Sequence, residues 1–107
     1  MISSEKLFDM LPIIVAIYDK LDLDVYRKKI QKENITKKLS AYDLGIVLGK
    51  YILTNSKNVK EELFEIVATM QEITLEEAKA QGPFKMITTL KAIFTDKDAV
   101  SFFKQAI

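Results

Sequence analysis

Three aspartates lie close together at Asp19, Asp22 and Asp24, and clustered carboxylates are the ligands that calcium prefers. An EF-hand loop that began at Asp19 would need a glycine at its sixth position and a glutamate at its twelfth. The sequence has Asp24 and Ile30 there instead. It therefore predicts no metal site and favours a solvated junction between two helices, because acidic side chains stabilise the N-terminus of the second helix.

Catalytic side chains are few, since the chain contains neither histidine nor cysteine. This excludes the Ser-His-Asp triad, cysteine nucleophiles and thiolate metal sites. No glycine-rich phosphate loop is present. A Ser-Lys pair stays open, although no feature of the sequence points to one. The carboxylate pairs Glu61/Glu62 and Glu76/Glu77 fall near predicted helix starts, where the helix dipole favours them. We therefore predict a non-enzymatic protein without a cofactor.

Basic side chains gather in the segment 26–38, YRKKIQKENITKK, whereas both ends of the chain are net acidic. Such cations can neutralise nucleic-acid phosphates. However, the isoelectric point of about 7.8 is low for a dedicated binder, and the helix predicted next, AYDLGIVLGKYIL, lacks polar base-reading side chains. The segment favours a solvated face or an electrostatic contact with an acidic partner over nucleic acid. Its basic residues are Arg27, Lys28, Lys29, Lys32, Lys37 and Lys38.

Gly45 and Gly49 lie four residues apart on one predicted helix, so they share a face on which another backbone can approach closely. The favoured interpretation is a close crossing by one of the protein's own helices. The alternative is a shallow groove that accepts a partner helix.

The segment DAVSFFKQAI has apolar residues around more than half of the predicted helix. One core-facing stripe needs less than that. We expect one phenylalanine to enter the core, with Phe103 as the candidate, while Phe102 faces outward toward a partner.

Helical spacing of apolar residues recurs along the chain, and three glycines with two prolines leave few turn signals for hairpins. We predict an all-α protein that forms a single compact domain over residues 1–107, with six or seven helices. The first helix should begin at Ser4 and kink or restart at Pro12. Its predicted inner face consists of Leu7, Leu11, Ile14, Tyr18 and Leu21.

Further helices are predicted from their capping residues. A helix over 24–32 should bury Leu23, Tyr26 and Ile30. Pro83 should open another helix in its first turn. That helix is expected to bury Phe84, Ile87, Leu90 and Phe94. The other predicted helix starts are the pairs Ser40/Asp43, Asn58/Glu61, Thr74/Glu77 and Thr95/Asp98.

The sequence predicts neither a secretory signal nor a membrane-spanning helix. The first ten residues, MISSEKLFDM, carry acids where a secretory signal needs a basic start. No apolar run approaches the roughly 20 residues that span a bilayer. We expect a cytoplasmic protein that does not enter the membrane.

Three stretches that together span most of the chain resemble a known family in their arrangement and length. They are KLFDMLPIIVAIYDKLDLD, VKEELFEIVATMQEITLEEAKAQ and TTLKAIFTDKDAVSFFKQAI. They are similar to the tail assembly chaperones of long, non-contractile-tailed bacteriophages and prophages. The resemblance implies a non-enzymatic, all-α protein that binds the helical tape measure protein, helps to recruit the tail tube protein and is absent from the mature virion.

Two alternatives compete with this chaperone hypothesis. The first is a small helical DNA-binding regulator that uses the segment 26–38. The second is a generic adaptor that associates with itself. Across these hypotheses the candidate partner-binding residues are Phe102, Phe103, Gly45, Gly49, Arg27, Lys28 and Lys32.

Overall fold

The structure, a computed structural model, describes residues 2–33 and 40–107. Within these ranges the chain forms seven α-helices and one short 3-10 helix, without strands. The predicted all-α class is therefore confirmed. The elements are α1 (Ser4–Lys20), α2 (Leu23–Glu33), α3 (Ala41–Thr54), η1 (Ser56–Asn58), α4 (Lys60–Gln71), α5 (Leu75–Ala80), α6 (Pro83–Phe94) and α7 (Lys97–Ala106).

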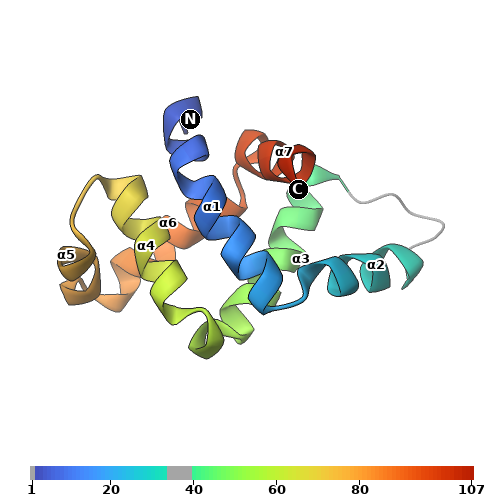
Figure 1. Ribbon diagram of the computed structural model, residues 1–107, viewed down its shortest axis with the longest axis horizontal. Coiled ribbons are helices and arrows are strands. Elements are labelled where there is room, and N and C mark those ends of the chain that lie inside the picture. The colour runs from blue at the N-terminus through green and yellow to red at the C-terminus, as the bar shows by residue number, and fades with distance from the viewer. Residues whose placement is uncertain (1, 34–39) are drawn as a thin grey trace.

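Helix α1 crosses the middle of the molecule, with α4 on one side and α3 with α7 on the other (Figure 1). Helix α5 lies at one end of the long axis and α2 at the other. Both ends of α1 are tied to α4. Lys6 donates a hydrogen bond of 2.9 Å to the carbonyl of Met70, and Lys20 pairs with Glu62. Since these contacts join residues far apart in sequence, they set the position of α1 in the bundle.

One hydrophobic core holds the helices together. Its most deeply buried large side chains are Met10, Ile17, Val59, Ile66, Val67 and Ile93. The predicted inner face of α1 is correct at Leu7 and Leu21, and Ile14 and Tyr18 are half-buried against the core. Met10 and Ile17, which were not predicted, are fully buried. Helix α1 continues through Pro12, which is exposed, so of the two predicted alternatives, a kink or a restart, the restart is wrong.

Two of the four predicted helix caps are confirmed. The Ser40 side chain accepts from the backbone N–H of Asp43 at 3.1 Å. Thr74 and Glu77 form a complete capping box, in which each side chain accepts from the backbone of the other.

The other two caps were placed one residue too early. Val59, not Asn58, precedes α4, and its side chain is fully buried. Asp96, not Thr95, caps α7 by accepting from the N–H of Ala99 at 2.9 Å. The Thr95 hydroxyl instead donates to the carbonyl of Lys91 at 2.7 Å, a local bond that competes with capping.

The predicted inner face of α6 is only half correct. Leu90 and Phe94 are buried, as is Ile93. Phe84, however, is 88% exposed and Ile87 is 40% exposed. The first half of α6 therefore leaves apolar side chains at the surface, where the amphipathic pattern had placed them in the core.

Candidate functional site

Gly45 and Gly49 are buried where α3 passes beneath the junction of α6 and α7. A β-carbon at position 45 would overlap the carbonyl oxygen of Phe94 and lie 2.6 Å from a methyl group of Val100. At position 49 it would lie 3.0 Å from the β-carbon of Phe94. The close crossing by the protein's own helices is confirmed. The glycines are covered by Phe94 and Val100, so the alternative of a partner helix packed on them is wrong for this conformation.

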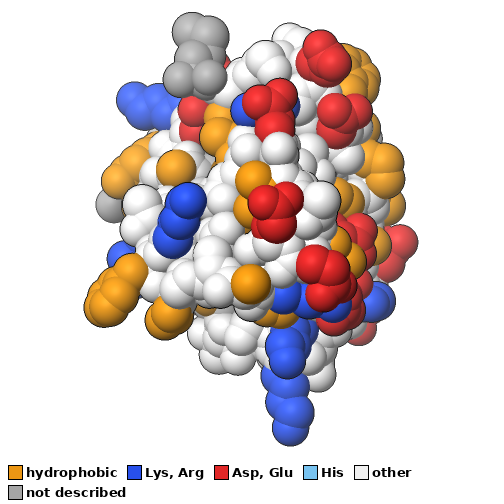
Figure 2. Space-filling view, turned by 90° about the vertical axis from the view of Figure 1, so that its left-hand side faces the viewer, with side chains coloured by type: hydrophobic (Ala, Val, Ile, Leu, Met, Phe, Trp, Pro, Cys, Tyr) orange, Lys and Arg blue, Asp and Glu red, His pale blue; other side chains and the backbone are white. Residues whose placement is uncertain are grey.

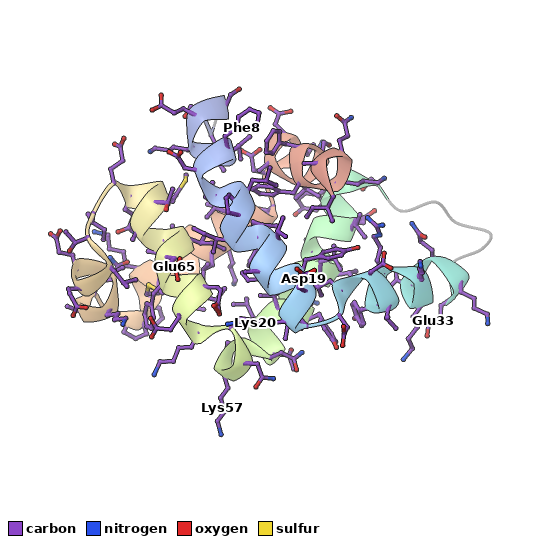
Figure 3. All side chains as sticks on the ribbon, in the orientation of Figure 1. Phe8, Asp19, Lys20, Glu33, Lys57 and Glu65 are labelled. Atoms are coloured by element: carbon purple, nitrogen blue, oxygen red, sulfur yellow. The ribbon has the colours of Figure 1, made fainter. Side chains whose placement is uncertain are left out.

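Three aromatic rings, Phe8, Phe102 and Phe103, form a continuous surface between α1 and α7, which we call the aromatic surface. Phe8 is 62% exposed and meets Phe102 edge to face, with ring centroids 5.1 Å apart. Phe102 meets Phe103 in the same way at 5.5 Å. In Figure 3, Phe8 lies beside α7. The contiguous rings leave part of each aromatic side chain available to a partner.

Phe102 and Phe103 are buried to a similar degree, contrary to the prediction. Both rings are half-buried against the core cluster, so the prediction that Phe103 is a core residue and Phe102 an outward one is wrong. Phe102 and Phe103 lie about 100° apart on a helix, and Phe102 is the one whose ring meets Phe8 of α1. Phe8, which the sequence analysis did not select, is the most exposed member of the surface. Phe8 was not predicted, because the inner face of this helix was assigned to Leu7 and Leu11 and Phe8 falls outside that pattern.

The basic segment is partly neutralised by its own helix. Asp24 pairs with Lys28 at 3.1 Å and with Arg27 at 3.5 Å. Arg27 also lies over the ring of Tyr18, 5.9 Å from its centroid. Lys32 is exposed, whereas Lys37 and Lys38 lie outside the described residues. Arg27 and Lys28 are thus engaged with Asp24 instead of projecting freely toward phosphates.

The contacts around Asp24 also change proton affinities. Hydrogen bonds from Lys28 and then Tyr18 hold the pKa of the Asp24 carboxyl below its usual value. Burial, together with the bond of 3.1 Å that it donates to Asp24, raises the pKa of the Tyr18 hydroxyl. Both shifts favour an ionised carboxylate beside a neutral phenol at neutral pH. This cluster joins α1 to α2 and stabilises their junction.

A small cavity lies between α3 and the helices above it. It has a volume of about 80 Å³ and is lined mainly by apolar side chains, among them Ile14, Leu48 and Phe103. Ligand pockets usually measure about 300–1,000 Å³. At about 80 Å³ this cavity is too small for an ordinary ligand, and we interpret it as a packing defect beneath α7.

A larger depression lies at the other end of the molecule, between α4 and α6, and we call it the α4–α6 groove. Its volume is about 580 Å³. Its apolar lining comprises Leu53, Leu63, Phe64, Pro83, Met86, Ile87 and Leu90, and its polar lining comprises Ser56, Lys57, Lys60, Lys79 and Gln81. Figure 2 shows this end, where hydrophobic, basic and acidic side chains all reach the surface. The groove was not predicted from the sequence, because the helical spacing placed Ile87 in the core.

Neither a metal site nor a membrane span is found in the part of the chain that the structure describes. No group of three or more acidic side chains there is arranged to hold a metal ion, the cluster Asp19, Asp22 and Asp24 included. No helix in residues 2–33 or 40–107 has the length and apolar character needed to cross a membrane.

The comparisons with known proteins add no relative. The chain matches no family model, no curated protein and no solved structure.

Proposed function

We propose that this protein is a non-enzymatic assembly chaperone that binds an amphipathic helical client through the aromatic surface. The single observation that carries the proposal is the exposure of Phe8 next to Phe102 and Phe103. Burying such rings against a client's apolar stripe removes them from water, which favours association. We expect the client segment to be an amphipathic helix, because such a helix presents a continuous apolar stripe on one face to the three rings.

The identity of the client comes from the family resemblance. Its sequence stretches contribute α1 and α7, the two helices that form the aromatic surface. In this proposal the client is the tape measure protein of a bacteriophage or prophage, and the chaperone keeps it from aggregating in the host cytoplasm until the tail tube protein is recruited. A protein with this role needs exposed apolar contacts and no catalytic group.

Co-expression tests the proposal. The full chain, carrying an affinity tag, is expressed with the tape measure protein of the same genome, and the amount of soluble tape measure protein that co-purifies is measured. We expect a soluble complex. Phe8→Ser and Phe102→Ser should each lower the affinity for the client about 30-fold or more, and its recovery accordingly, since a lost aromatic anchor costs about 2 kcal/mol or more at an interface.

Val25→Ser is the matched control, because Val25 is 67% exposed but lies on α2. It should leave recovery unchanged. If wild-type protein recovers no tape measure protein, the chaperone proposal fails. If Phe8→Ser and Val25→Ser behave alike while the complex persists, the client binds elsewhere.

The DNA-binding alternative has less support from the geometry, since Asp24 occupies both Arg27 and Lys28. It predicts binding to duplex DNA that weakens steeply with salt and is reduced by Lys28→Ala or Lys32→Ala. No binding at low ionic strength would exclude it.

A further inference from the structure

We propose that the α4–α6 groove is a second docking site, which takes an acidic amphipathic helix from a partner protein. The site is separate from the aromatic surface: the groove is lined by residues of α3, η1, α4, α5 and α6, whereas the aromatic surface belongs to α1 and α7. The proposal therefore goes beyond client binding by the aromatic surface. It makes the protein an adaptor with two faces.

The floor of the groove has the chemistry of a helix-binding site. Leu63 and Phe64 come from α4, and Met86, Ile87 and Leu90 come from α6. Ile87 remains 40% exposed, and Phe84, one turn earlier on α6 but outside the groove lining, is 88% exposed. Exposed apolar side chains that cluster at a concave surface mark an interaction site more strongly than scattered ones do. A helix that lays an apolar stripe into the groove would remove them from water.

The rim of the groove is basic. Lys79 is paired with Glu61 at 3.1 Å. Lys57 and Lys60 are exposed and form no ion pair with any residue that the structure describes. In Figure 3, Lys57 points away from η1 into solvent. Cationic side chains beside an apolar floor are complementary to a helix whose polar flank carries Asp or Glu.

The groove is held in shape before a partner arrives. The amides of Gln71 and Gln81 exchange hydrogen bonds of 3.0 and 2.8 Å, and Gln71 also donates to the hydroxyl of Thr89 at 2.8 Å. These bonds join α4, the α5–α6 connection and α6. A preformed groove lowers the entropic cost of binding. A nucleic acid would satisfy the lysines but leave the apolar floor exposed, so an acidic helix fits the groove better.

Two synthetic peptides test the site with the full chain. Both are about 18 residues long, or five turns, and carry the same leucine stripe. One has glutamate and the other lysine at the flanking positions. Fluorescence anisotropy with labelled peptide measures the affinity at low and at about 0.3 M salt. We expect the glutamate peptide to bind about tenfold or more tightly than the lysine peptide, with an affinity that falls as salt rises.

Variants locate the binding. Ile87→Glu and the double variant Lys57→Glu/Lys60→Glu should each weaken binding of the glutamate peptide about tenfold or more. The matched controls on α2, Val25→Glu and Lys29→Glu/Lys32→Glu, should not. Phe8→Ser should leave the preference for the glutamate peptide and its salt dependence unchanged, because these properties come from the lysines of the groove and not from the aromatic surface. Circular dichroism confirms that each variant is folded.

Three results would overturn the proposal. The first is equal affinity for the two peptides, which would show apolar adhesion without charge selection. The second is loss of binding in Phe8→Ser together with retention in Ile87→Glu. The third is a wild-type dimer in sedimentation that Ile87→Glu dissociates, which would assign the groove to a second copy of this chain. Failure of tape measure co-purification alone would not affect the proposal, since that experiment probes the aromatic surface.

Discussion

The carbonyl oxygen of Phe94 lies against the backbone of Gly45, in the space that a β-carbon at position 45 would occupy. This contact brings the end of α6 directly onto α3. Because α7 begins three residues later, at Lys97, the same contact also sets where α7 lies on the bundle. The position of the aromatic surface, and so the proposed client site, depends on this crossing.

Replacement of Gly45 by alanine should therefore destabilise the fold. The added methyl group meets backbone, which cannot rotate away, so we expect Gly45→Ala to lower the free energy of unfolding by about 2–3 kcal/mol or more. Denaturation by urea measures the change. Gly82→Ala is the control, because nothing lies within 4 Å of a β-carbon there, and its effect should stay within about 1 kcal/mol. Equal effects of the two substitutions would contradict the close crossing.

The pair Lys20–Glu62 should contribute more to stability than an ordinary surface ion pair. Glu62 is only 8% exposed, and both of its oxygens accept from Lys20, at 2.9 and 2.8 Å. Lys20→Met leaves the carboxylate without that partner and should cost about 1–3 kcal/mol. A double-mutant cycle with Glu62→Gln, followed by thermal melting, measures the coupling. Additive losses would mean that the pair is not coupled.

The start of α7 gives a prediction that separates two neighbouring residues. Asp96→Ala removes the side chain that accepts from Ala99 and should cost about 1 kcal/mol. Thr95→Ala removes only an exposed hydroxyl bond to Lys91 and should cost less than about 0.5 kcal/mol. Urea denaturation compares them. A larger loss for Thr95→Ala would restore Thr95 as the cap.

Stability should fall on the acid side partly through Glu77. The hydrogen bond from the backbone N–H of Thr74, and then its side chain, hold the pKa of the Glu77 carboxyl below its usual value. The folded state thus binds a proton less readily than the unfolded state. The stabilisation is complete above the unfolded pKa of about 4.3 and is lost as pH falls through the lower folded pKa.

Melting temperatures of wild type and Glu77→Gln, measured across this range, test the linkage. The difference between them should be largest above about pH 5 and should shrink toward lower pH. Glu76→Gln is the control, since Glu76 is exposed and takes no part in the capping box. A difference that did not change with pH would exclude a role for the Glu77 charge.

The sequence by itself determined the local elements of this protein. Pro83 has a preset backbone angle and needs no N–H in the first turn, so it opens α6 as predicted. The side chains of Ser40 and Thr74 each accept a hydrogen bond from the backbone N–H three residues later, so both caps can be predicted without knowledge of any tertiary contact. Leu23 and Ile30 repeat with helical spacing on a short helix that has only one apolar side, and both are buried.

Only the tertiary structure decided which apolar side chains are covered. Phe84 and Ile87 obey the same helical spacing as Leu90, yet no neighbouring helix buries them, and the exposed Ile87 lines the α4–α6 groove. Phe8 is likewise 62% exposed, although its ring meets that of Phe102 on α7. A periodic pattern of apolar residues indicates only that a residue can be buried. Whether it is buried depends on contacts between residues distant in the chain, and in this protein both proposed docking surfaces consist of apolar residues for which those contacts are incomplete.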